Sequence, residues 1–226
     1  MTGAVVTAQC RELLARAARW RLLGLLFERP RSGWREQVHS LAAEVQDDEL
    51  VRAARRAAAQ ATESLFLAVL GPGGEASPRE VACRPLGDPG RVLAELAACY
   101  AAFAFAPTTE EPPDHVSVEV GFAGYLLLKE AFACAAGDPE ARSLAAAAGE
   151  EFRREHLAAL AATLPQGLRV HRDTYLGDAA RLLQQWVGPV PAACGAGVLS
   201  CRSEDESPCG VCCPLGPQDP PAGIGP

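Results

Sequence analysis

Residues 110–129 read EEPPDHVSVEVGFAGYLLLK and contain the strongest structural signals in the chain. Pro112 and Pro113 prevent a helix from running through them, because proline lacks an amide donor and restricts the residue before it. Asp114 follows, and its carboxylate is expected to cap a helix by accepting from the free amides of the first turn. From His115 onward apolar residues occur on nearly every side, which predicts a largely buried helix.

Polar side chains mark the start of this apolar helix. His115 and Glu119 are one turn apart and therefore share a face. Together with Asp114 they could form an acid–base set, or Asp114 could cap while Glu119 orients His115 in the core. Because no nucleophile or oxyanion-stabilising device accompanies them, we expect that the chain is not an enzyme. Carboxylates in such a cluster can also pair bidentately with arginines of a partner.

The composition favours an acidic, helical, water-soluble protein. Of 226 residues 49% are apolar and the formal net charge is −7, which disfavours a nucleic-acid partner. Alanine and leucine dominate, which predicts helices rather than strands. No segment approaches the ~20 apolar residues of a membrane span. The first ten residues lack the basic start of a secretory signal, so we expect a cytoplasmic protein with no membrane insertion.

The pattern along the chain predicts an all-α, single-domain helical bundle over residues 1–188. The glycine cluster at 71–74 lacks the Lys-Ser/Thr end of a phosphate-binding loop, so residues 71–88 are interpreted as an internal linker. Four cysteines lie in apolar helical stretches and are expected to be reduced: Cys10, Cys83, Cys99 and Cys134. Helices besides the central one are expected over 10–28, 34–45, 47–68, 89–103, 139–163 and 172–187.

The segment Glu111-Pro112-Pro113-Asp114-His115, with Glu119 four residues on, resembles the signature of the TorD/DmsD/NarJ family of redox-enzyme maturation chaperones. Flanking segments match in the same order, namely residues 20–27, 100–103 and 152–157. The family usually has a tryptophan soon after the last of these, where this chain has alanines. The resemblance covers about residues 13–187, and it implies a TorD-like bundle related to the nitrate reductase delta subunit.

The resemblance implies a cytoplasmic chaperone that binds the precursor of a molybdenum-containing oxidoreductase during cofactor insertion and assembly. The partner would be the apo-molybdoenzyme catalytic subunit or its twin-arginine leader peptide, captured in a helical groove. The chaperone would be a monomer or a homodimer, with no tightly bound cofactor. The residues expected to bind the partner are Tyr100, Phe103, Glu111, Pro112, Asp114, His115, Glu119, Glu155 and His156.

Residues 189–226 are rich in Cys, Pro and Gly and are expected to have little regular structure. Within them Cys209-x-x-Cys212-Cys213, together with Cys201, has spacing that suits zinc or an iron–sulfur cluster. This pattern supports an alternative function, a metal- or redox-linked adaptor that acts through the C-terminal cysteines. The usual dinuclear site of helical bundles is excluded, because the position three before each candidate histidine is Pro112 or Arg153 rather than glutamate.

Overall fold

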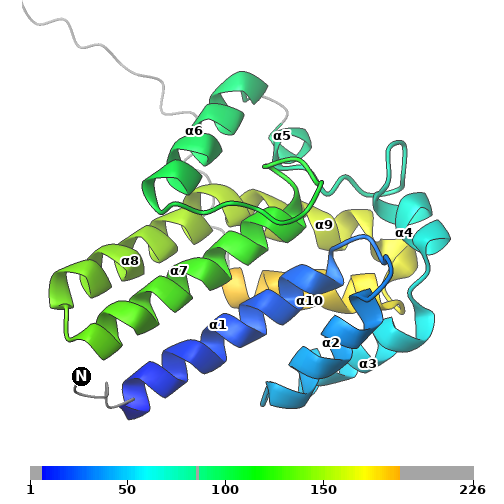
Figure 1. Cartoon of the computed structure of the whole chain (residues 1–226). Helices are drawn as coiled ribbons and strands as arrows, with labels where there is room; N and C mark the ends of the chain where they lie inside the picture. The colour runs from blue at the N-terminus through cyan, green and yellow to red at the C-terminus, as the bar shows by residue number, and fades with distance from the viewer. Residues whose placement is uncertain (1–6, 85–86, 189–226) are drawn as a thin grey trace, which may run out of the picture. The chain divides into compact units, whose positions relative to one another are not determined.

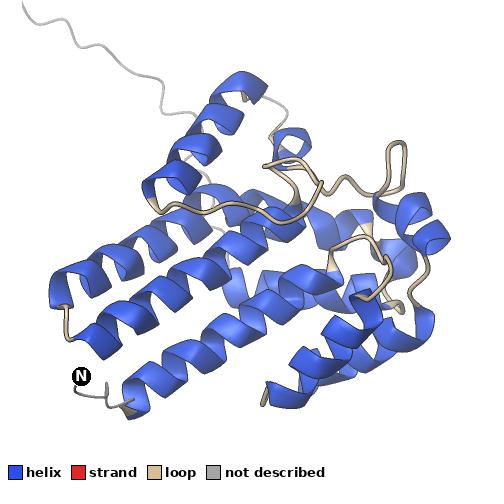
Figure 2. Cartoon of the chain, viewed as in Figure 1, coloured by secondary structure: helices blue, strands red, loops and turns tan. Residues whose placement is uncertain are grey.

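The computed structural model describes residues 7–84 and 87–188, and every regular element within these ranges is a helix (Figures 1 and 2). The expected all-α fold is confirmed. No helix in the described part of the chain is long and apolar enough to cross a membrane. The elements in order are α1 (Ala8–Leu26), α2 (Trp34–Glu44), α3 (Asp48–Gln60), α4 (Glu63–Leu70), α5 (Glu80–Cys83), α6 (Pro89–Ala102), α7 (Val116–Ala136), α8 (Pro139–Phe152), the π-helix η1 (Arg153–Leu157), α9 (Ala158–Gly167), the 3₁₀ turn η2 (Arg169–His171) and α10 (Tyr175–Val187).

The two longest helices, α1 and α7, pack closely along their length in antiparallel directions (Figure 1). Two glycines allow the close approach. A Cβ added to Gly24 would lie 3.3 Å from the backbone oxygen of Ser117, and one added to Gly124 would lie 3.1 Å from Cβ of Trp20. The predicted burial of the central helix is confirmed, since most of the α7 side chains are buried.

Other helices complete the core around this pair. Helix α8 packs beside α7, and α10 contacts α1, α3 and α9. The rings of Trp20 on α1 and Trp186 on α10 meet edge to face, with centroids 5.4 Å apart. Such aromatic pairs add to the apolar area that drives the packing.

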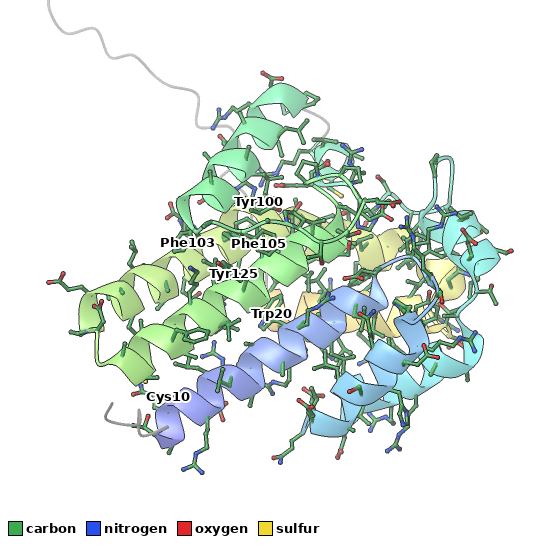
Figure 3. The ribbon with its side chains drawn as sticks, in the orientation of Figure 1. Cys10, Trp20, Tyr100, Phe103, Phe105 and Tyr125 are labelled. Atoms are coloured by element: carbon green, nitrogen blue, oxygen red, sulfur yellow. The ribbon has the colours of Figure 1, made fainter. Side chains whose placement is uncertain are left out.

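Helix α6 lies over the first half of α7 and attaches to it through aromatic rings. Phe122 of α7 is the centre of this cluster, with ring centroids 4.8 Å from Tyr100, 5.1 Å from Phe105 and 4.7 Å from Phe152. Figure 3 shows Tyr100, Phe103, Phe105 and Tyr125 gathered where α6 and its following loop cross α7. The cluster thereby fixes the loop that leads to the proline segment at 112–113.

Several predicted helix boundaries are wrong, each for a local reason. The helix expected over 47–68 is two helices, because Thr62 caps α4 by accepting from the Leu65 amide at 3.1 Å. The helix expected over 139–163 is interrupted by η1 and continues to Gly167. The last helix begins at Tyr175, since Thr174 caps it. The expected linker at 71–88 includes the short helix α5.

The close approach of α1 and α7 makes a direct prediction about two glycines on one helix. Gly124→Ala should lower the free energy of unfolding by roughly 1–2 kcal/mol, because its new methyl group meets the α1 backbone and Trp20. Gly121→Ala should raise it by up to about 1 kcal/mol, because nothing lies within 4 Å of its Cβ and alanine favours a helix. Urea unfolding of both variants measures the difference. Equal effects would contradict this description of the helix pair.

Candidate partner-binding site

The start of α7 is capped by His115 and not by Asp114, so the predicted cap is wrong. The backbone of His115 is extended, and its Nδ1 accepts from the Ser117 amide at 3.2 Å. Asp114 cannot serve this role because its carboxylate turns away and accepts from Nε of Arg79 at 2.5 Å. The side chain of Asp114 is completely buried.

A segment distant in sequence lies against this helix start. We call residues 76–84, which include α5, the strap. The backbone oxygen of Pro78 accepts from the Val116 amide at 2.8 Å, and the Glu80 amide donates to the Asp114 oxygen at 2.9 Å. With the Arg79–Asp114 ion pair, these bonds hold the strap beside the proline segment. The strap therefore satisfies backbone groups that a buried helix start leaves unpaired.

The buried carboxylate of Glu80, within the strap, meets a histidine from a distant part of the chain. Glu80 is fully buried and forms an ion pair with Nη2 of Arg84 at 2.6 Å, and its Oε2 lies 3.1 Å from Nδ1 of His156. The π-helix η1 carries His156 and turns it into the core. Such a single-turn π segment re-aims the side chains of a helix and is common at functional sites.

Glu119 lies fully buried on the first turn of α7 and has no hydrogen-bond partner for either carboxylate oxygen among the described residues. Burial, followed by the nearby charges of Glu80 and Asp114, raises the pKa of Glu119 well above its usual value. Burial therefore favours the protonated, uncharged form of this carboxyl. An uncharged carboxyl can remain in the core at a cost that a carboxylate there would greatly exceed.

His115 is also buried and uncharged. Burial, with a smaller contribution from the Arg79 charge, lowers the pKa of His115 to about 4. Its Nδ1 lies 2.7 Å from the Ser117 hydroxyl, and its Nε2 is 3.9 Å from a carboxylate oxygen of Glu111. The ring thus links the helix cap to the proline segment at its other edge.

The predicted aromatic residues are largely interior. Tyr100 is 6% exposed, and its hydroxyl donates to the Pro113 oxygen at 2.7 Å. Phe103 packs partly buried against Phe122. In this conformation Tyr100 supports the proline segment from within the bundle, and Phe103 packs on α7 beside it.

A cavity of about 430 Å³ opens on the outer side of the strap. It is bordered by the proline segment, the C-terminal part of α4 and the glycine loop. The lining residues are Arg29, Phe66, Leu67, Leu70, Gly71, Pro72, Gly73, Gly74, Ala76, Ser77, Pro78, Arg79, Glu111, Pro112 and His115. Three predicted site residues, Glu111, Pro112 and His115, therefore share one concave surface.

Sequence reasoning did not identify most of this cavity. The glycine loop at 71–74 has the composition of a plain linker, and the apolar pattern of α4 continues that of α3. One usable signal was the apolar run 65–70 directly before a glycine-rich loop, where Leu67 remains 38% exposed. A second cavity of about 230 Å³ adjoins and shares Arg29 and Glu111 with the first.

Charged groups around the cavity differ in whether they have partners. Arg29 pairs with Glu63, and Glu110 pairs with Arg31 at 2.7 Å. Glu111 has no arginine or lysine nitrogen within 4 Å among the described residues, and its nearest basic group is the ring of His115, which burial keeps neutral. Glu111 is therefore the acid at this surface that remains available to a cation.

The other predicted residues lie elsewhere. Glu155 is exposed and accepts from its neighbour Arg154 at 3.0 Å, while His156 faces the core. The structure brings His156 to Glu80 rather than to the cavity.

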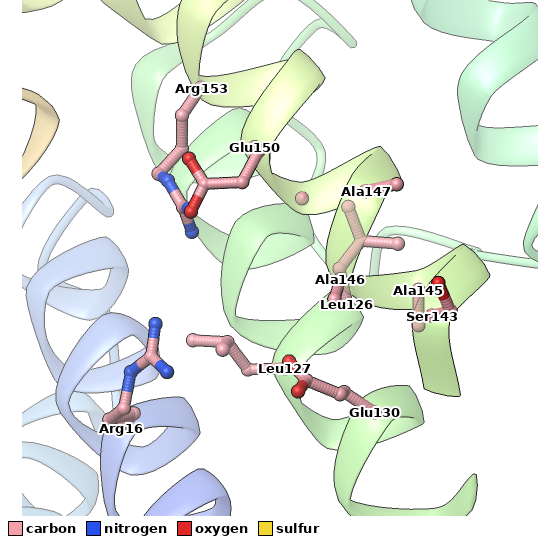
Figure 4. A pocket seen from close by; sticks show the side chains of 11 residues that line it. Arg16, Leu126, Leu127, Glu130, Ser143, Ala145, Ala146, Ala147, Glu150 and Arg153 are labelled. Carbon is pink, nitrogen blue, oxygen red and sulfur yellow. The ribbon is translucent and has the colours of Figure 1, made fainter. Parts of the chain in front are cut away.

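A further cavity of about 330 Å³ lies between α1, α7 and α8, where Arg16, Glu130, Glu150 and Arg153 surround apolar α7 side chains (Figure 4). Arg153 pairs with Glu150, and Glu130 lies 3.6 Å from Arg142. None of the predicted partner-binding residues lines this cavity.

No cluster of three or more potential metal ligands occurs within residues 7–84 and 87–188. The predicted metal ligands Cys201, Cys209, Cys212 and Cys213 lie outside the described residues, as does the rest of the segment 189–226. The four cysteines of the helical region are free thiols, of which Cys10 is buried and the other three are partly buried.

Comparison with known proteins agrees with this architecture. Residues 28–164, more than half of the chain, match the sequence model of the family described as nitrate reductase delta subunit. The chain belongs to this family, whose members are chaperones for molybdoenzyme maturation. A search of curated protein sequences finds no significant match. The matched region contains the strap, the proline segment and η1, so the whole candidate site lies within the family region.

The lowered pKa of His115 predicts a loss of stability in acid. In the unfolded chain the His115 ring takes up a proton below its ordinary pKa of 6.5, whereas in the native state the ring stays neutral down to about pH 4. The free energy of unfolding therefore falls as the pH falls through this window. His115→Asn keeps a capping acceptor and does not titrate. Between pH 7.5 and pH 5 the wild type should lose about 2 kcal/mol relative to this variant in chemical unfolding. The exposed His39→Asn is the control and should follow the wild type.

The raised pKa of Glu119 predicts that stability depends on pH in the opposite direction. In the native state Glu119 keeps its proton at pH values where the unfolded chain, with the ordinary pKa of 4.5, has released it. The contribution of Glu119 to stability therefore falls as the pH rises. Glu119→Gln keeps the shape without titrating. Its free energy of unfolding should rise relative to wild type between pH 5 and pH 8, by up to about 1.4 kcal/mol per pH unit. A pH-independent difference would show that Glu119 is ionised in the native state. Glu155→Gln, on the surface, should show no such trend.

Proposed function

We propose that this protein acts in the cytoplasm as a chaperone that binds the precursor of a molybdenum-containing oxidoreductase while the cofactor is inserted. The bound segment is the twin-arginine leader or N-terminal region of the catalytic subunit. The observation that supports this most is the 430 Å³ cavity, which combines one available carboxylate, Glu111, with an apolar wall from α4. A basic and apolar peptide segment needs both features.

Within this proposal the acidic residues have different roles. Glu111 contacts an arginine of the partner, because it faces the cavity without a cation of its own. Asp114 already holds Arg79, and Glu119 is buried as a neutral acid, so both act by fixing the segment that presents Glu111. Tyr100 supports the same segment from the core, and Phe103 packs against Phe122.

The apolar wall from α4 binds the apolar side chains of the peptide. Phe66 and Leu70 are buried at its base, while Leu67 is 38% exposed. Burial of such a surface by a leader leucine or phenylalanine stabilises the complex by roughly 25 cal/mol per Å² of apolar area. The cavity's two arginines do not oppose a basic ligand strongly, because Arg29 and Arg79 each have a carboxylate partner.

The charge part of the proposal is tested by two adjacent glutamates. Glu111→Gln should weaken the binding of a twin-arginine leader peptide about tenfold to thirtyfold, because one charge-assisted contact is lost. Glu110→Gln should change the affinity less than about twofold, since this side chain is exposed and already pairs with Arg31. Calorimetric titration measures both. Equal affinities for the two variants would place the peptide elsewhere on the protein.

The apolar part is tested by two leucines of similar exposure. Leu67→Ala at the cavity should weaken peptide binding severalfold, while Leu14→Ala on α1 should leave it unchanged. Both side chains are about 40% exposed, so both variants should fold with nearly wild-type melting temperatures. If the Leu67 variant bound as the Leu14 variant does, the α4 wall would not belong to the binding site.

A further inference from the structure

The thiols of Cys10 and Cys134 are in direct contact although 124 positions separate them in the sequence. Their sulfur atoms lie 2.8 Å apart, and a disulfide bond is about 2.05 Å long, so the two atoms have about 0.8 Å to close. Cys10 lies in the first turn of α1, and Figure 3 labels it at the start of this helix. Cys134 lies near the end of α7. The antiparallel packing of the two helices creates this contact.

The surroundings favour a reactive pair. The Thr7 hydroxyl, which caps α1, lies 3.0 Å from the Cys10 sulfur. Hydrogen bonds with Cys134 and Thr7 lower the pKa of the Cys10 thiol, and the free amides of a helix start also favour a thiolate. Cys134 is partly exposed, so a small reagent can reach the pair from solvent. Cys83 differs, since burial raises the pKa of its thiol.

We propose that Cys10 and Cys134 form a reversible disulfide that cross-links α1 to α7 when the protein meets a small-molecule disulfide oxidant such as oxidised glutathione. Cys134 is the sulfur that solvent reaches, whereas Cys10 is buried. The Cys134 thiolate, formed by loss of its proton to water, attacks one sulfur of the reagent, which forms a mixed disulfide and expels one thiolate. That thiolate takes the proton of Cys10, and the Cys10 sulfur then attacks the Cys134 sulfur and expels the second thiolate. The pair loses two electrons, and the reagent is reduced to two thiols.

The position of the cross-link separates it from the partner-binding site. Cys134 is 18 residues from Val116, which corresponds to about 27 Å along a helix with a 1.5 Å rise. The bond joins the ends of the helices that form the centre of the bundle, and it closes a long loop in the unfolded chain. Oxidation should therefore raise stability while leaving the cavity at the other end of α7 unchanged.

Peptide mapping of the oxidised full-length protein gives an unambiguous assignment. Tryptic cleavage after Arg11, Lys129 and Arg142 yields peptides 1–11 and 130–142, each with a single cysteine. After treatment with oxidised glutathione, a non-reducing digest should contain these two peptides joined, and dithiothreitol should separate them. The melting temperature should rise by roughly 5–15 °C on oxidation and return on reduction.

Matched variants test the same inference. Cys10→Ser and Cys134→Ser should each abolish the joined peptide and the thermal shift, whereas Cys99→Ser, on α6, should retain both. Leader-peptide affinity should be the same in the oxidised and reduced wild type. A digest in which Cys10 or Cys134 is joined to another cysteine, or carries only glutathione, would overturn the proposal, as would a joined peptide without any change in melting temperature.

Discussion

The attachment of the strap to the start of α7 is the interaction on which the candidate site depends. A helix that begins inside the protein must satisfy its first amides without water, and here a remote segment provides the acceptor through the Pro78 oxygen. The Arg79–Asp114 ion pair fixes the same junction from the side chains. Because the strap also borders the glycine loop, one set of contacts both closes the core and shapes the cavity.

The sequence was sufficient for the helices but not for every boundary. Periodic apolar positions predict the helices because each buries one face, and capping residues such as Asp88 and Asp138 have local chemistry that can be recognised from sequence. The π-helix at 153–157 could not be predicted in this way, since its geometry follows from the tertiary position of His156 against Glu80. The cap of α7 was assigned to Asp114 because the competing partner, Arg79, is 35 positions away.

The candidate site, too, could be predicted from the sequence only in part. The motif predicted that polar residues would gather at the start of α7, and they do. It could not show which carboxylates the protein's own cations neutralise, because that depends on pairings such as Glu80 with Arg84 and Asp114 with Arg79. Of the acids singled out, Glu111 is the one that lines the cavity without a cationic partner in the described part of the chain. The wall from α4 has no motif at all, since apolar residues before a loop occur in most helices.

Helix α7 therefore joins two regions with different chemistry. At its start lie a buried carboxyl whose pKa is raised and a buried histidine whose pKa is lowered, and burial is the main cause of both shifts. Its last turns contain a thiol in contact with α1. Gly24 and Gly124 allow α1 and α7 to approach closely along the length that connects these regions. A stabilising bond at the thiol end would strengthen the support of the strap without altering its contacts, which separates the stability of the bundle from the affinity of the cavity.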